Sequence, residues 1–143
     1  MGDCIDWSLT LLGTEIARAI DTEEAFGILD ESGEDRLTSW TSGGCLILSD
    51  ALSKLLNADQ WTIFVGDTPH HAVVRYDGAF FDADGAFDVV GIQAKFAATE
   101  GVDLEDVELI MGRFDDGLRE DPEATRRVVL LLEECGIGPL NHW

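Results

Sequence analysis

Lysine is scarce in this chain: two lysines and seven arginines stand against 29 acidic residues, which gives a formal net charge of −20. A surface this acidic repels the phosphates of nucleic acids and anionic membrane surfaces, so neither is expected as a partner. A peptide-like or cationic protein substrate is favoured instead. The excess of Asp and Glu over Lys suits a halophilic protein, because salt screens the self-repulsion, although an ordinary acidic protein has the same composition.

Long apolar runs and close-spaced cysteines are absent as well. No segment approaches the roughly 20 apolar residues of a membrane span, and the acidic first residues lack the basic and apolar parts of a secretory signal. The three cysteines, Cys4, Cys45 and Cys135, show no CxxC spacing, so neither a zinc ribbon nor a disulfide framework is indicated. These absences predict a cytoplasmic protein with free thiols and with no cofactor or metal ion.

The length of 143 residues and a hydrophobic content of 45% predict a single domain over residues 1–143. Apolar residues at helical spacing predict two N-terminal helices within 8–29 and a C-terminal helix over 122–134. The core is expected over 37–111, with a buried helix that begins at Cys45 and a small antiparallel sheet. The class is therefore α+β, with flanking helices. Strands are expected over 61–65, 71–76, 79–82 and 107–111, and a further helix after Asp88.

Cys45 follows two glycines and opens the apolar helix. A thiolate is the nucleophilic form of cysteine, and a helix N-terminus stabilises it through unpaired N–H groups and the dipole. Gly44 lets the backbone approach a substrate carbonyl closely, and the N–H of Cys45 is a candidate half of an oxyanion hole. The alternative is that Cys45 is a small apolar filler of a buried helix.

The dipeptide Asp77-Gly78 predicts a tight hairpin between the next two strands. If these are the two turn residues, His71 lies opposite Asp84 and diagonal to Asp82, all on one face of the sheet. A carboxylate beside His71 would fix its tautomer and stabilise the imidazolium. His70 points to the other face in this register. The alternative for the two aspartates is simple turn chemistry.

The segment from Ser42 to Gly85 resembles the core of papain-like and transglutaminase-like cysteine hydrolases, in its Gly-Cys helix start and its His-Ala-Val-Val and Phe-Phe-Asp-Ala-Asp-Gly strands. The resemblance implies a central cysteine helix packed on the sheet. It also implies Cys45 as nucleophile, His71 as general base and Asp82 as the orienting acid, with Asp84 as second choice.

The side chain that would complete the oxyanion hole has no motif match. The tryptophan common after the nucleophile in these families is also missing, because Leu46 stands there. Trp40 and Gln93 are the candidates beside Gly44 for the oxyanion and substrate site.

The sequence thus predicts a hydrolase or acyltransferase that cleaves an amide, isopeptide or thioester bond through a Cys–His–Asp triad. A catalytically inactive binding or accessory module on the same fold is the alternative. A metal site of Cys45, His71 and Asp82 is a third possibility. The oligomeric state does not follow from the sequence.

Overall fold

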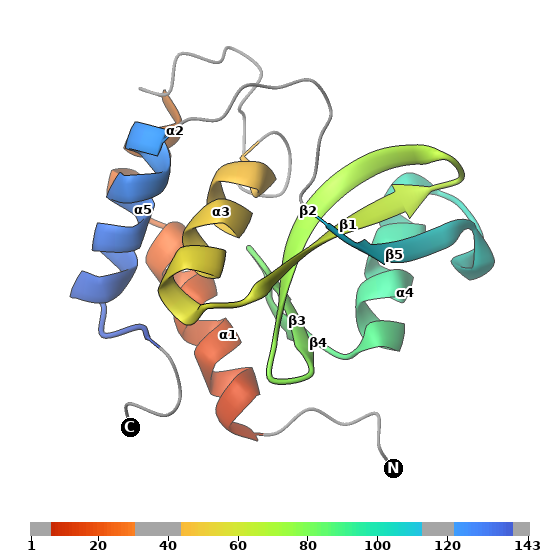
Figure 1. The fold of residues 1–143 in the computed structure, drawn as a ribbon, viewed down its shortest axis with the longest axis horizontal. Helices are drawn as coiled ribbons and strands as arrows, with labels where there is room; N and C mark the ends of the chain where they lie inside the picture. The colour runs from red at the N-terminus through yellow and green to blue at the C-terminus, as the bar shows by residue number, and fades with distance from the viewer. Residues whose placement is uncertain (1–6, 31–43, 113–121, 139–143) are drawn as a thin grey trace.

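The computed structural model describes residues 7–30, 44–112 and 122–138, and it confirms the α+β class (Figure 1). The described helices are α1 (Trp7–Ile20), α2 (Glu23–Asp30), α3 (Cys45–Leu56), α4 (Val89–Glu100) and α5 (Pro122–Glu134), with a short 3-10 helix, η1 (Leu104–Asp106). The strands are β1 (Asp59–Val65), β2 (Thr68–Tyr76), β3 (Ala79–Asp82), β4 (Gly85–Phe87) and β5 (Val107–Met111). Among these segments, no helix has both the length and the apolar character that crossing a bilayer requires.

The strands form one antiparallel sheet in the order β4-β3-β2-β1-β5. Strand β2 pairs with β1 along most of its length, but it pairs with β3 only over Val74, Arg75 and Tyr76. Residues 68–72 of β2 therefore extend past the end of β3. At this free edge, side chains from the two faces of the sheet can meet.

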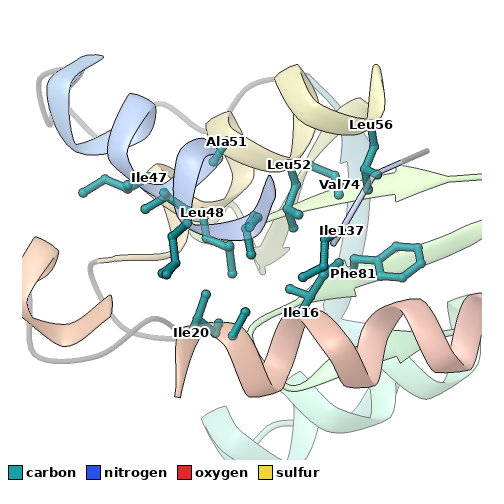
Figure 2. Packing of buried hydrophobic residues seen from close by; sticks show 14 of the residues in the cluster. Ile16, Ile20, Ile47, Leu48, Ala51, Leu52, Leu56, Val74, Phe81 and Ile137 are labelled. Atoms are coloured by element: carbon teal, nitrogen blue, oxygen red, sulfur yellow. The ribbon is translucent and has the colours of Figure 1, made fainter. Parts of the chain in front are cut away.

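Helices cover both faces of the sheet (Figure 1). Helices α1, α3 and α5 lie on one face, where Ile16, Leu48 and Leu52 pack around Phe81 (Figure 2). Helix α4 lies on the other face and buries its Phe96 in a second cluster. Burying each such side chain stabilises the fold by about 1.5–3 kcal/mol. The sheet therefore has an apolar core on each of its two faces. The second cluster contains Ile63, Val73, Phe80, Ile92, Phe96, Ala97 and Val107.

The predicted hairpin is confirmed. Tyr76 pairs with Ala79 across the turn, and the two turn residues have φ angles of 52° at Asp77 and 88° at Gly78. Two successive positive φ values are what a two-residue hairpin of right-handed twist requires. The turn fixes the register, and so it fixes which side chains of β2 and β3 face α4.

Capping residues mark three helix ends, among them the predicted helix start after Asp88. Asn57 ends α3 with a left-handed φ of 56°, as a C-terminal cap does. The side chain of Asp88 caps α4 by accepting a hydrogen bond of 2.6 Å from the N–H of Gly91. Thr22 caps α2 through its hydroxyl, which accepts from the N–H of Ala25 at 3.2 Å.

Gly13 lets α1 approach β4. A Cβ atom at this position would lie 2.4 Å from the backbone nitrogen of Ala86 and 2.9 Å from the carbonyl carbon of Gly85. Both neighbours are backbone atoms, which cannot move aside as a flexible side chain would. The close contact holds β4 against the main core.

Two features of the sheet differ from the prediction. Strand β4 is not among the predicted strands, because three residues give no readable alternation. Strand β2 begins at Thr68, ahead of His71, and contains a bulge: Ile63 pairs with His71, whereas Phe64 pairs with Pro69. His70 is the extra residue of this bulge.

Candidate functional site

Cys45 is the first residue of α3 and is buried, with 8% of its surface exposed. Gly44 precedes it as the N-cap, and no side chain caps the helix. The N–H groups of a first helical turn have no partner within the helix, so this end favours negative charge. The side chain of Cys45 packs with Leu46 and Ala72.

His71 faces α4, where its ring lies 4.1 Å from the ring of Phe96, centroid to centroid. Its Nε2 atom lies 3.3 Å from Oε2 of Glu100. Its Nδ1 atom is buried and has no hydrogen-bond partner among the described residues. Burial lowers the pKa of His71 below its ordinary value of 6.5, against the opposing effect of Glu100. The imidazole is therefore neutral at pH 7.

Cys45 and His71 come from different faces of the sheet, yet both line one small cavity beside the end of β3. The volume of the cavity is about 10 Å³, which is roughly the room for one water molecule. Asp82 lines it as well. The three residues of the predicted triad thus line one small cavity.

Ser49 anchors α3 at this edge of β2. Its hydroxyl donates a hydrogen bond of 3.3 Å to the carbonyl oxygen of Val73, and it accepts one of 3.2 Å from Nε2 of Gln60. Ser49 also lines the cavity that contains Cys45 and His71. The hydrogen bond to Val73 thus places the first turns of α3 beside the cavity.

The two predicted orienting aspartates, Asp82 and Asp84, pair with Lys95 and not with His71. Lys95 of α4 donates a hydrogen bond to Oδ2 of Asp82, and its Nζ lies 2.6 Å from Oδ2 of Asp84. Burial raises the pKa of Asp82, although Lys95 opposes the shift. The predicted contact of either aspartate with His71 is thus replaced by an ion pair, because Lys95 competes for both carboxylates.

Glu100, at the end of α4, is the carboxylate that contacts His71, and the sequence prediction did not include it. Its second oxygen, Oε1, lies 3.2 Å from Nδ1 of His70. The expectation that His70 points to the other face is wrong, because the bulge gives two successive residues of β2 the same side. The sequence gives no local signal for this contact, which joins residues 29 positions apart.

The predicted oxyanion and substrate residues are not gathered in one place. Gly44 is buried directly before Cys45. Gln93 lines a different pocket, of about 500 Å³, and its Nε2 donates a hydrogen bond of 3.1 Å to the carbonyl of Val107. Trp40 lies outside the described residues. Of the two that the structure describes, Gly44 is the one next to Cys45.

The second pocket lies on the α4 side of the sheet. Trp61 and Phe80 form its aromatic wall, with their rings edge to face at a centroid distance of 5.5 Å. The guanidinium of Arg75 lies 6.0 Å from the centroid of the Trp61 ring, and Glu108 adds a carboxylate. Such a wall suits a planar or apolar group with a polar end.

One group of described side chains has the composition of a metal site. His70, His71 and Glu100 each offer a ligand atom, and these atoms all lie within 4.8 Å of one another. Cys45 and Asp82, which line the cavity, are not members of this group.

Comparison with known proteins gives no family model, no curated protein and no solved structure that matches this chain.

Proposed function

We propose that the chain is a cysteine-dependent hydrolase or acyltransferase that acts on an amide, isopeptide or thioester carbonyl. The observation that supports it most is the buried Nδ1 atom of His71, which has no hydrogen-bond partner among the described residues, on a residue that shares a cavity with Cys45. A buried polar atom without a partner costs about 1–3 kcal/mol. Such a cost is typical of a group that is kept ready for a reaction.

The hydrogen bond to Glu100 selects the tautomer of His71. With the proton on Nε2 donated to the carboxylate, the lone pair of Nδ1 is available as a base. In the proposed step, Nδ1 takes the proton of the Cys45 thiol, and the sulfur attacks the carbonyl carbon. The developing oxyanion is stabilised by N–H groups at the start of α3.

The tetrahedral intermediate then collapses. The bond from carbon to the leaving amine or thiol breaks, and the leaving group takes the proton from the imidazolium of His71. The acyl group remains on Cys45 until water or another nucleophile attacks it, with His71 again acting as base. Glu100 holds the imidazole throughout and stabilises its positive charge, the role that the resemblance assigns to Asp82.

Substrate size and charge follow from the site and the composition. The cavity of about 10 Å³ accepts only a small group unless the surrounding chain moves. The net charge of −20 favours a cationic or peptide-like partner. Thiol chemistry needs a reducing compartment, so we place this activity in the cytoplasm.

A binding module without catalysis is the second candidate. The low exposure of Cys45, 8%, and the small size of the cavity favour it. In that case the pocket of about 500 Å³ beside Trp61 and Arg75 is the more suitable place for a ligand. Binding that persists in a Cys45→Ser variant would point to this function.

Trapping of an acyl-enzyme tests the proposal. The full chain is mixed with a small activated thioester, and the modified residue is identified by peptide mass mapping. We expect one acyl group on Cys45, and its loss in the Cys45→Ser and His71→Gln variants. Acylation of the exposed Cys135 alone would contradict the proposal, because exposure without activation then explains the reactivity.

A further inference from the structure

We infer that His70, His71 and Glu100 form a binding site for a divalent transition-metal ion of the Zn²⁺ type. The bulge in β2 makes His70 the residue without a pairing partner in β1. Adjacent strand residues ordinarily point to opposite faces. Here both imidazoles turn toward the same glutamate at the end of α4, so a metal-binding pair is built from neighbouring residues.

The distances between the ligand atoms suit a four-coordinate ion. Nδ1 of His70 lies 3.2 Å from Oε1 of Glu100, and Nε2 of His71 lies 3.3 Å from Oε2. Ligand bonds of about 2.0–2.2 Å in tetrahedral geometry put neighbouring ligand atoms about 3.3–3.6 Å apart. All three ligand atoms lie within 4.8 Å of one another, so small rotations of the side chains suffice.

The chemistry and exposure of the three groups also fit. Two imidazoles with one carboxylate are a ligand set that Zn²⁺ accepts, and three protein ligands leave a position for water or substrate. His70 is 34% exposed and gives the ion a path from solvent, whereas His71 is 12% exposed and held against Phe96.

Metal binding would oppose thiol activation, a consequence that rests on the proposed function. A metal ion on Nε2 of His71 takes the lone pair of that atom, so the proton of the neutral ring must sit on Nδ1. Nδ1 can then no longer accept the proton of Cys45. The ion is therefore expected to inhibit the thiol through the residue that the two sites share.

Calorimetric titration with Zn²⁺ tests the site. The protein is the full chain with Cys4→Ser and Cys135→Ser, two substitutions that remove the thiols other than Cys45. We expect one Zn²⁺ per chain. His70→Ala and Glu100→Gln should each weaken binding at least about tenfold, because even losing a residue that only supports a ligand costs that much. Glu105→Gln removes an equal charge from an exposed position nearby and should leave the affinity unchanged.

Two results would overturn the site. Equal weakening by Glu105→Gln and Glu100→Gln would mean diffuse binding to the acidic surface. Loss of binding in Cys45→Ser would mean that the thiol, not His70, completes the ligand set.

Co²⁺ gives an independent readout, since its visible spectrum should report tetrahedral coordination in the Cys45→Ser variant as in the parent chain. An octahedral spectrum that resembles aqueous Co²⁺ would contradict the site.

The alkylation rate of Cys45 with and without Zn²⁺ separates the two proposals. A rate that falls at least about tenfold on saturation, but not in His70→Ala at the same Zn²⁺ concentration, supports the shared role of His71. If Zn²⁺ binds as expected and the rate does not change, the metal site stands and the role of His71 as base for Cys45 is contradicted.

Discussion

Glu100 contacts His71 through Nε2, at 3.3 Å, and leaves the buried Nδ1 atom of the same ring without a hydrogen-bond partner among the described residues. One nitrogen is therefore held by a carboxylate, and the other is available for chemistry. The hydrogen bond and charge of Glu100 raise the pKa of His71, although burial lowers it by more. The carboxylate of Glu100 thus limits how far burial lowers the pKa of this ring.

Glu100→Gln should lower the pKa of His71 further and slow the alkylation of Cys45. The amide keeps the shape of the side chain but removes its charge, so the imidazolium loses its stabilising partner. Each unit of pKa lost reduces the thiolate–imidazolium pair about tenfold. NMR titration of the His71 ring and the alkylation rate at pH 7 measure the two effects.

Glu105→Gln, which removes the same charge from an exposed position, is the matched control. It should leave both quantities as in the parent chain. An unchanged His71 titration in Glu100→Gln would show that the carboxylate does not set the state of this ring.

Lys95→Met should destabilise the protein by about 3–5 kcal/mol, the usual cost of leaving one partner of a buried ion pair without its counter-charge. Asp82 is 6% exposed and loses the donor to its Oδ2 atom. Urea unfolding measures the loss. The double variant Lys95→Met/Asp82→Asn should recover part of it, because no buried carboxylate remains. Equal losses in the single and the double variant would mean that the lysine acts through its cation–π contacts with Phe87 and Phe96.

Stability should fall with acidification below pH 6.5 because of His71. Its pKa is lowered in the folded state, so the unfolded chain binds the proton first, and protonation favours unfolding. The stabilising contribution is complete above the ordinary value of 6.5 and is lost as the pH falls toward the lowered pKa. One proton gives a slope of at most about 1.4 kcal/mol per pH unit.

Asp82 gives the opposite slope. Its pKa is raised above 3.8, so its protonated form stabilises the fold, and this contribution is lost as the pH rises through the raised value. The comparison of the parent chain with His71→Gln by urea unfolding between pH 5 and 7 isolates the histidine. Parallel pH curves for the two proteins would contradict the assigned shift.

Gly13→Ala should destabilise the fold by about 1–3 kcal/mol, the usual cost of inserting a methyl group where no space exists. The new Cβ would meet backbone atoms of Gly85 and Ala86, so α1 must move away from β4. Thermal unfolding measures the effect. Gly27→Ala, in α2 and with no atom within 4 Å of the added Cβ, is the control and should stabilise by about 0.5–1 kcal/mol. Equal behaviour of the two variants would contradict the close approach.

Local signals predicted most of the fold. The start of α3 at Cys45, the Asp77-Gly78 turn and the Asp88 cap depend on residues next to one another, and the structure confirms each. The turn also fixed the register that puts His71 and Asp82 on the α4 face. The likeness to papain-like and transglutaminase-like cores remains a prediction.

The partners of these side chains could not be predicted in the same way. The bulge at His70 depends on how β2 matches β1, and the contacts of Glu100 and Lys95 depend on the way α4 packs across the sheet. The two contacts of α4 join residues 29 and 13 positions apart, and the bulge depends on the pairing of two whole strands. A register argument confined to one hairpin therefore predicted the wrong carboxylate for His71.

The rate at which a small alkylating reagent modifies Cys45, relative to Cys135, tests the central claim most directly. Cys45 is buried and Cys135 is exposed, so exposure alone makes Cys135 the faster thiol. If His71 activates Cys45, mass mapping at pH 7 should show Cys45 reacting at least about tenfold faster, with the advantage lost in His71→Gln. Slower reaction of Cys45 than of Cys135, unchanged in His71→Gln, would contradict the claim that these two residues form a reactive pair.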